Sequence, residues 1–302
     1  MKSNIKTNIL KSAWKKFISF SIGARIALIL FFFLFVFEAI IHLMPIFWVV
    51  NTSFKSVYSP LNSFAVEPEL FTFNNLKLVF TKFKILGLRY TGMLMNSLWT
   101  TVLYIFVNVM SSTLLAYALA RLNFPGKDFL YGLLIFIRTI PIMSTGSANF
   151  KLCVALGMVN NPLLIWLGWA GAFDYTCFIL YGTFKSISKT YSEAAEIEGA
   201  NQFQVLFRII FPQAFPAILA LAVTNITARW NDYTTSQIYL NKYPNLAYGL
   251  YQFANGSNNA SFSGGKLMYY AALLCAALPV VIIYATTQGL ILKNISVGGI
   301  KG

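Results

Sequence analysis

The segment Glu193-Ala194-Ala195-Glu196-Ile197-Glu198-Gly199 carries the residue types best suited to binding a partner protein. Glutamates can form ion pairs with basic residues of a partner, and small alanines give a helix a narrow face that can enter a cleft. Gly199 permits a turn with positive φ, and after nine more residues Ile209-Ile210-Phe211-Pro212 leads into an apolar run. The sequence predicts a docking helix with Glu193 as its ionic contact. The alternative is a surface helix whose glutamates only keep it in water.

Residue types needed for catalysis or metal binding are scarce. The chain has no Gly-x-x-x-x-Gly-Lys-Ser/Thr phosphate loop, which excludes the usual P-loop nucleotide site. His42 is the single histidine, so neither a multi-histidine metal site nor a histidine-based triad is expected. Cys153, Cys177 and Cys275 are odd in number and lie in or beside apolar stretches, which favours packing roles. We expect no catalysis, metal or cofactor on this chain, with energy supplied by a partner or an ion gradient.

Glu38 and His42 stand four residues apart in an apolar run, so they can face each other on a helix. Ionisable groups inside membranes are functional candidates by default, and this pair would suit a proton relay. We favour the simpler interpretation, in which the two groups satisfy each other's hydrogen bonds against neighbouring helices.

The composition is that of an integral membrane protein. Of 302 residues, 57% are hydrophobic, 17% aromatic and only 11% charged, with a mean hydropathy of +0.65. The apolar runs are long and continuous, which favours membrane helices over the alternating pattern of a barrel. The net charge of +14 is scattered around these runs, so it indicates membrane topology and no nucleic-acid partner.

The sequence predicts an all-α membrane protein with six transmembrane helices. They cover about residues 25–50, 90–120, 129–150, 162–184, 212–233 and 267–292. The expected organisation is a basic N-terminus (1–24), one transmembrane domain (25–292) and a tail (293–302). The outer loop 51–89 contains the start of a short surface helix near 71–76, and a polar loop spans 185–211. The side of that polar loop and of both termini has 13 Lys and Arg against 8 opposite, so the positive-inside rule makes it cytoplasmic.

The polar loop resembles the EAA signature of ABC importer permeases. The signature is glutamate-alanine-alanine, three residues, glycine, nine residues, isoleucine, one residue, leucine and proline, and Phe211 stands where leucine is usual. Further stretches are similar to MalG-type permeases of carbohydrate importers, a family described as binding-protein-dependent transport system inner membrane components. They are Asn96-Ser97, residues 116–126, Ile140-Pro141, residues 230–233 and the tail 297–302. Ile142 stands where this family usually has a second proline.

The resemblance implies a permease that moves a sugar or oligosaccharide across the cytoplasmic membrane of a bacterium by alternating access. The implied partners are a second homologous permease, an ATPase dimer that holds ATP and Mg, an extracytoplasmic sugar-binding protein and membrane lipid. The loop 185–211 would be the coupling helix on the ATPase, with contacts at Glu193, Ala194, Ala195, Glu196, Glu198, Gly199, Ile209 and Pro212. The tail would also contact the ATPase, through Gly298, Gly299, Lys301 and Gly302.

Candidates for the translocation path follow from chemistry alone, because aromatic faces stack on sugars while amides and carboxylates bind hydroxyl groups. The suited residues are Trp166, Trp169, Asp174, Tyr175, Asn225, Arg229, Trp230, Asn231 and Asp232. Two alternatives stay open. The cargo could be a peptide, a polyamine or another solute, or the chain could be a proton-driven secondary transporter.

Overall fold

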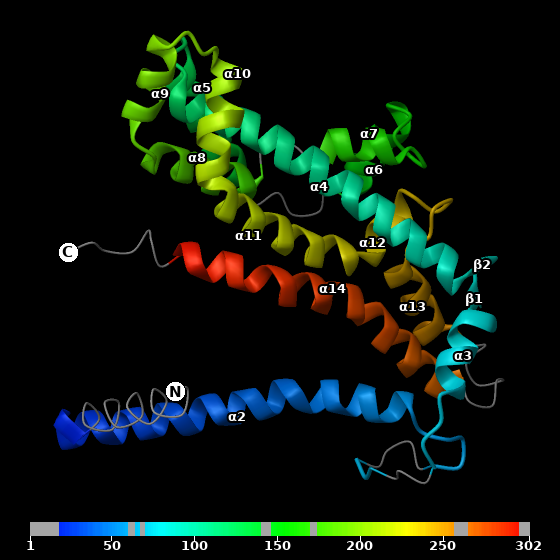
Figure 1. The fold of residues 1–302 in the computed structure, drawn as a ribbon. Helices are drawn as coiled ribbons and strands as arrows, with labels where there is room; N and C mark the ends of the chain where they lie inside the picture. The colour runs from blue at the N-terminus through cyan, green and yellow to red at the C-terminus, as the bar shows by residue number, and fades with distance from the viewer. Residues whose placement is uncertain are drawn as a thin grey trace.

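The computed structural model describes residues 18–59, 64–66, 70–139, 146–169, 174–256 and 265–295. Almost all regular structure in these parts is helical, as the sequence predicts. Four of the described helices are long and apolar enough to cross a membrane: α2 (Ile22–Ser53), α4 (Tyr90–Arg121), the run Gln202–Trp230, and α14 (Gly265–Ile295) over Gly265–Leu290. α4, α11 (Phe211–Trp230) and α14 run obliquely in roughly the same direction, and α2 lies below α14 (Figure 1).

The regions of the third and fourth predicted spans contain shorter helices. α5 (Lys127–Thr139) and α6 (Gly146–Ala155) occupy the first region, and α7 (Pro162–Trp169) and α8 (Tyr175–Ser186) occupy the second. Residues 140–145 and 170–173, where each predicted span would be continuous, are outside the described part. The all-α class is therefore confirmed, and the count of six spans stays a prediction.

The run Gln202–Trp230 consists of α10 (Gln202–Val205), a π-helical turn (Leu206–Ile210) and α11 (Phe211–Trp230). Pro212 lies in the first turn of α11, where its missing N–H is tolerated. The N–H of Phe211 donates to the carbonyl of Leu206, five residues back, so the chain continues as a helix through the proline region. The helix that contains the fifth predicted span therefore begins at Gln202, ten residues before the predicted start at residue 212.

The polar end opposite the EAA loop is built from small elements. α3 (Asn74–Thr81) confirms the predicted surface helix and leads into a hairpin of β1 (Lys84–Ile85) and β2 (Leu88–Arg89). α12 (Tyr233–Ile238) and α13 (Leu246–Asn255) follow α11 and lie near this end (Figure 1). The start of α2, the end of α14 and α9 (Lys189–Ile197) lie on the opposite side of the molecule, with α2 well separated from α9 (Figure 1).

Three apolar clusters hold the helices together. One joins α4, α8 and the run 202–221, and another joins α3, α4, α13 and α14 around Trp230. The third joins α4, α7 and the end of α12. α2 packs on α14 near Trp48 and Tyr270, whose ring centroids are 5.2 Å apart. The apolar middle section of α2 is otherwise not covered by the rest of the described chain. This exposure is expected for a helix surrounded by lipid or by another membrane helix.

Candidate docking site and translocation path

The EAA segment forms the short helix α9, which is capped at both ends by residues that flank it in the sequence. Ser188 precedes it, and its Oγ accepts a hydrogen bond from the N–H of Thr190 at 3.3 Å. At the other end the N–H of Gly199 donates to the carbonyl of Glu196, and the N–H of Ala200 donates to that of Ala195. This pattern is a Schellman motif, and the φ of +87° at Gly199 is the left-handed conformation that it requires. The predicted helix, glycine turn and following helix are all present.

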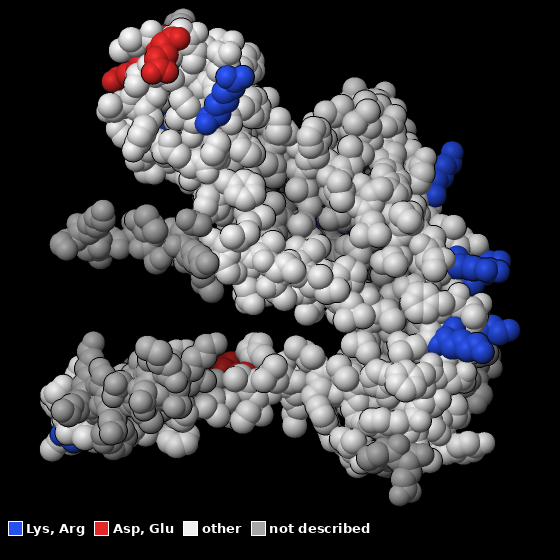
Figure 2. All heavy atoms as spheres, viewed as in Figure 1, with Lys and Arg blue, Asp and Glu red and all other residues white. Residues whose placement is uncertain are grey.

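The side chains of α9 divide into an outer and an inner face. Glu193, Ala194 and Glu198 are exposed, and Figure 2 shows acidic side chains at the tip of this end of the molecule. Ala195 is buried and packs in the cluster of α4 and α8. The two alanines therefore have different positions, since Ala195 holds α9 to the body and Ala194 lies on the outer surface. Ile197, which the sequence did not single out, is 87% exposed and adds an apolar contact to that surface.

Polar contacts fix α9 to the membrane helices. The hydroxyl of Tyr117 on α4 donates to Oε1 of Gln202 at 2.7 Å, and Nε2 of Gln202 donates to Oε1 of Glu196 at 2.8 Å. Arg121, the last residue of α4, donates from Nη2 to the carbonyls of Phe184 and Ile187 at the end of α8. Glu196 is thus engaged within the chain, which leaves Glu193 and Glu198 as the acidic groups for a partner.

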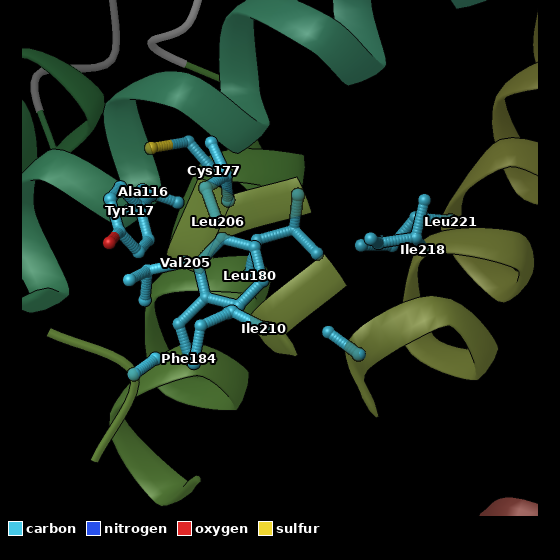
Figure 3. Packing of buried hydrophobic residues seen from close by; sticks show 12 residues of the cluster. Ala116, Tyr117, Cys177, Leu180, Phe184, Val205, Leu206, Ile210, Ile218 and Leu221 are labelled. Carbon is cyan, nitrogen blue, oxygen red and sulfur yellow. The ribbon is translucent and has the colours of Figure 1, made fainter. Parts of the chain in front are cut away.

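Ala195 of α9 belongs to an apolar cluster of α4, α8 and the run 202–221, and Figure 3 shows its packing. Leu180 and Phe184 of α8 meet Leu206 and Ile210 of the π-helical turn, and all four are almost completely buried. Ile209 is half-buried against this cluster, whereas Pro212 is exposed. A displacement of α9 would therefore be transmitted to α4, α8 and α11 together. The predicted tail contacts Gly298, Gly299, Lys301 and Gly302 lie outside the described residues.

Several path candidates meet where α4, α8 and α11 cross. Nδ2 of the buried Asn225 is within 3.4 Å of Oδ1 of Asn108 and within 3.3 Å of Oγ1 of Thr176. The hydroxyl of Tyr175 donates to Oδ1 of Asn225 at 3.1 Å. Asp174 precedes α8, accepts from the N–H of Tyr175 and forms an ion pair of 2.7 Å with Arg138 of α5. These contacts place hydrogen-bonding groups from different helices in one network.

A second group of candidates surrounds Arg229. Its guanidinium lies 4.1 Å from the ring centroid of Tyr104 and 5.2 Å from that of Trp166. Nη1 donates to Asp232 at 2.9 Å, and Asp232 also caps α12 through the N–H of Thr235. Trp166, Arg229 and Asp232 border a small cavity with mixed polar and apolar walls, which is lined by Thr100, Thr101, Trp166, Arg229, Asp232, Thr235, Ser236, Leu240 and Asn245.

The remaining candidates have other positions. Trp230 is buried, and its Nε1–H donates to the carbonyl of Ala276 at 2.9 Å, so it joins α11 to α14. Asn231 is exposed and donates to the carbonyl of Thr227, beside a groove between α11, α13 and α14. Trp169 is the last residue of α7. These three residues were path candidates because of their chemical type. For Trp230 the structure shows a packing contact instead.

The Glu38 and His42 pair lies on the exposed surface of α2. Nδ1 of His42 is 2.7 Å from the backbone carbonyl of Glu38 and 3.6 Å from its carboxylate. The two residues therefore lie side by side on the helix as predicted, but the short contact is to the backbone carbonyl, and both side chains are exposed where packing against neighbouring helices was expected. In the described parts of the chain, no group of three or more His, Cys, Asp or Glu is arranged to hold a metal ion.

Long apolar helices with an exposed acidic helix at one end are the features expected of a membrane permease. The family model "Binding-protein-dependent transport system inner membrane component" matches residues 112–297, so the chain belongs to this family. The MalG-type resemblance is thereby confirmed.

Proteins of known name are similar along most of the chain. The galactooligosaccharides transport system permease protein GanQ of Bacillus subtilis is 28% identical over 280 residues, which cover 92% of this chain and 96% of GanQ. The inner membrane ABC transporter permease protein YcjP of Escherichia coli is 31% identical over 87% of this chain and 92% of its own length. A crystal structure of a bacterial ABC transporter involved in alginate import contains a chain with a TM-score of 0.76 and 25% identity. That match covers 89% of this chain and 98% of the other. The relatives are transport subunits, and this chain is one as well.

Proposed function

We propose that this chain is the permease subunit of an ATP-driven importer that moves a sugar or oligosaccharide across the cytoplasmic membrane of a bacterium. It acts with a second homologous permease, an ATPase dimer and an extracytoplasmic binding protein. The proposal is supported by family membership and by relatives named for galactooligosaccharides, trehalose and maltodextrin. In the proposed topology the six predicted spans leave α9 and both termini in the cytoplasm.

One structural observation carries the mechanism: α9 is attached to three membrane helices at once. Tyr117 and Gln202 connect it to α4, Arg121 ties the end of α4 to α8, and the cluster beneath it includes α11. Glu193 and Ala194 remain exposed for the cleft of an ATPase subunit. Closure of the ATPase dimer would move α9, and the packed cluster would transmit this movement to the spans. The ATP and Mg belong to the partner.

The path that these helices would open contains groups that bind sugar hydroxyls. The network of Asn225, Tyr175 and Thr176 lies on α8 and α11, two helices that share an apolar cluster with Ala195 of α9. The small cavity beside Arg229 and Trp166 lies further along α11. Alternating access would expose these groups first to the outer side and then to the cytoplasm. In this mechanism the chain provides hydrogen bonds and ring faces, and performs no covalent chemistry.

Uptake of labelled saccharides tests the function. Cells that lack this chain, and the same cells with it restored, are compared across a panel of mono- and oligosaccharides. We expect restored uptake of at least one saccharide that stops on ATP depletion and continues in the presence of an uncoupler. Uptake that survives ATP depletion and collapses with an uncoupler would support a proton-driven transporter. A peptide or polyamine as the only restored substrate would refute the sugar assignment.

A further inference from the structure

The β1–β2 hairpin is a small projection at the end of the molecule opposite α9 (Figure 1). Lys84 pairs with Arg89 and Ile85 pairs with Leu88, so Leu86 and Gly87 form a two-residue turn. Both turn residues have positive φ, +50° at Leu86 and +80° at Gly87, as a type I′ turn requires.

The base of the hairpin is firmly anchored. Phe83, which precedes β1, is almost completely buried and stacks on Phe253 of α13 with centroids 5.0 Å apart. Tyr90, which follows β2, lies edge-on to Phe83 and donates its hydroxyl to the carbonyl of Ala272 at 3.2 Å. The N–H of Tyr90 also donates to the carbonyl of Phe83. The hairpin is therefore held in a fixed position relative to α4, α13 and α14.

Two features of the hairpin oppose its own stability. Lys84 and Arg89 are directly opposite each other, and like charges at such a position are destabilising. Leu86 has a left-handed conformation that is costly for a leucine, and its side chain is 57% exposed. Folding gains nothing from a cation pair and an exposed apolar tip. Both features are explained if the hairpin contacts a partner.

The surroundings of the hairpin carry the same charge. Lys77 of α3 and Lys82, which follows α3, are exposed in the segment that leads into the hairpin, and no acidic residue occurs in the sequence between Glu69 and Asp128. The ion pairs found in the described parts of the chain lie elsewhere. Figure 2 shows basic side chains along this end of the molecule, while the acidic side chains of α9 lie at the other end. This basic end also explains why the positive-inside bias of the sequence is small.

We propose that the β1–β2 hairpin docks the extracytoplasmic binding protein, with the tip Leu86 entering a small apolar depression bordered by acidic residues of that protein. The inference rests on the proposed function, because it assumes the topology that places the hairpin outside the cytoplasm. Charge complementarity steers the encounter, and an apolar contact ringed by polar groups gives it specificity. Anionic lipid is the other occupant that the charges allow. It is disfavoured because one leucine offers little apolar area for membrane insertion, and the basic side chains project outward from this end of the molecule (Figure 2).

The test uses the complete transporter in nanodiscs of neutral lipid, with its own binding protein in solution. Apparent affinity is measured by binding-protein stimulation of the ATPase and by a direct binding assay, at low and high salt. Lys84→Glu with Arg89→Glu reverses both charges, and Lys84→Arg with Arg89→Lys is the matched control that keeps them. Leu86→Asn removes the apolar tip but keeps a residue that tolerates the left-handed turn. Co-purification of the ATPase subunit verifies that each variant is assembled.

We expect charge reversal to weaken the apparent affinity about tenfold at low salt and to reduce its salt dependence. Leu86→Asn should weaken it several-fold at every salt concentration, and the charge-preserving control should match the wild type. Wild-type affinity in both the charge-reversed and the Leu86→Asn variants would overturn the docking role of the hairpin. It would leave the proposed function unaffected. An effect that appears only with anionic lipid would show that the hairpin binds the membrane surface, which also overturns it. If the wild-type transporter does not respond to the binding protein, the proposed function itself fails.

Discussion

Replacing Gly199 with alanine tests the turn that ends α9. Its φ is +87°, and an added Cβ would meet no atom within 4 Å, so the change costs backbone energy without a steric clash. The left-handed conformation is about 1–2 kcal/mol less favourable for alanine than for glycine. Part of this cost is offset because alanine also restricts the unfolded chain. We expect a net loss of about 1 kcal/mol, which corresponds to roughly a fivefold increase in the open state of the turn.

Two measurements detect this loss. Hydrogen exchange of the peptide that contains Ala200 should accelerate about fivefold, because its amide bonds to the carbonyl of Ala195 across the turn. The thermal midpoint of the purified transporter should fall by a few degrees, on the order of 2–4 °C. Gly182→Ala is the control, since Gly182 lies within α8 with open space around it and should become slightly more stable. Gly199→Asn should fall between wild type and alanine. Unchanged exchange in Gly199→Ala would refute the assigned turn.

Two further predictions concern the packing of the spans and are measured as stability in detergent. Asn225→Leu should lower the free energy of unfolding by about 1–3 kcal/mol, because Tyr175 and Thr176 lose a buried partner; a neutral effect would show that the network is not formed. Trp230→Phe should cost about 1 kcal/mol through loss of the hydrogen bond to the carbonyl of Ala276, while the apolar contacts largely remain. A Trp230→Phe variant that keeps full stability but loses sugar uptake would instead place Trp230 in the path.

The local structure of α9 could be predicted from sequence because its determinants are local. Ser188, Gly199 and Asn201 cap the two successive helices through residues two or three positions away. The attachment of α9 could not be predicted in the same way. Tyr117 is 85 positions from Gln202, and only the packing of α4 against the following helices brings the two together.

The path residues show the limit of choosing by chemical type. Trp230 and Asn225 are equally suited by chemical type to bind a sugar. In the structure, however, Trp230 joins α11 to α14, and Asn225 is the centre of a polar network. Asn108 and Thr176 belong to that network and were missed, because single polar residues in apolar runs carry no spacing signal. The hairpin was missed as well, because Leu86-Gly87 is not one of the dipeptides, such as Asn-Gly or Asp-Gly, that signal a two-residue turn.

The central claim is that α9 is the site where an ATPase subunit docks, with Glu193 as its ionic contact. The most direct measurement is co-purification of the ATPase subunit with Glu193→Lys, together with sugar uptake in the same cells. Asp128→Lys is the matched control, because it makes the same charge change at another exposed acidic residue at the start of α5. We predict that Glu193→Lys stays in the membrane, loses most of the ATPase subunit and abolishes uptake, while Asp128→Lys retains both. Normal ATPase association and uptake in Glu193→Lys would contradict the claim.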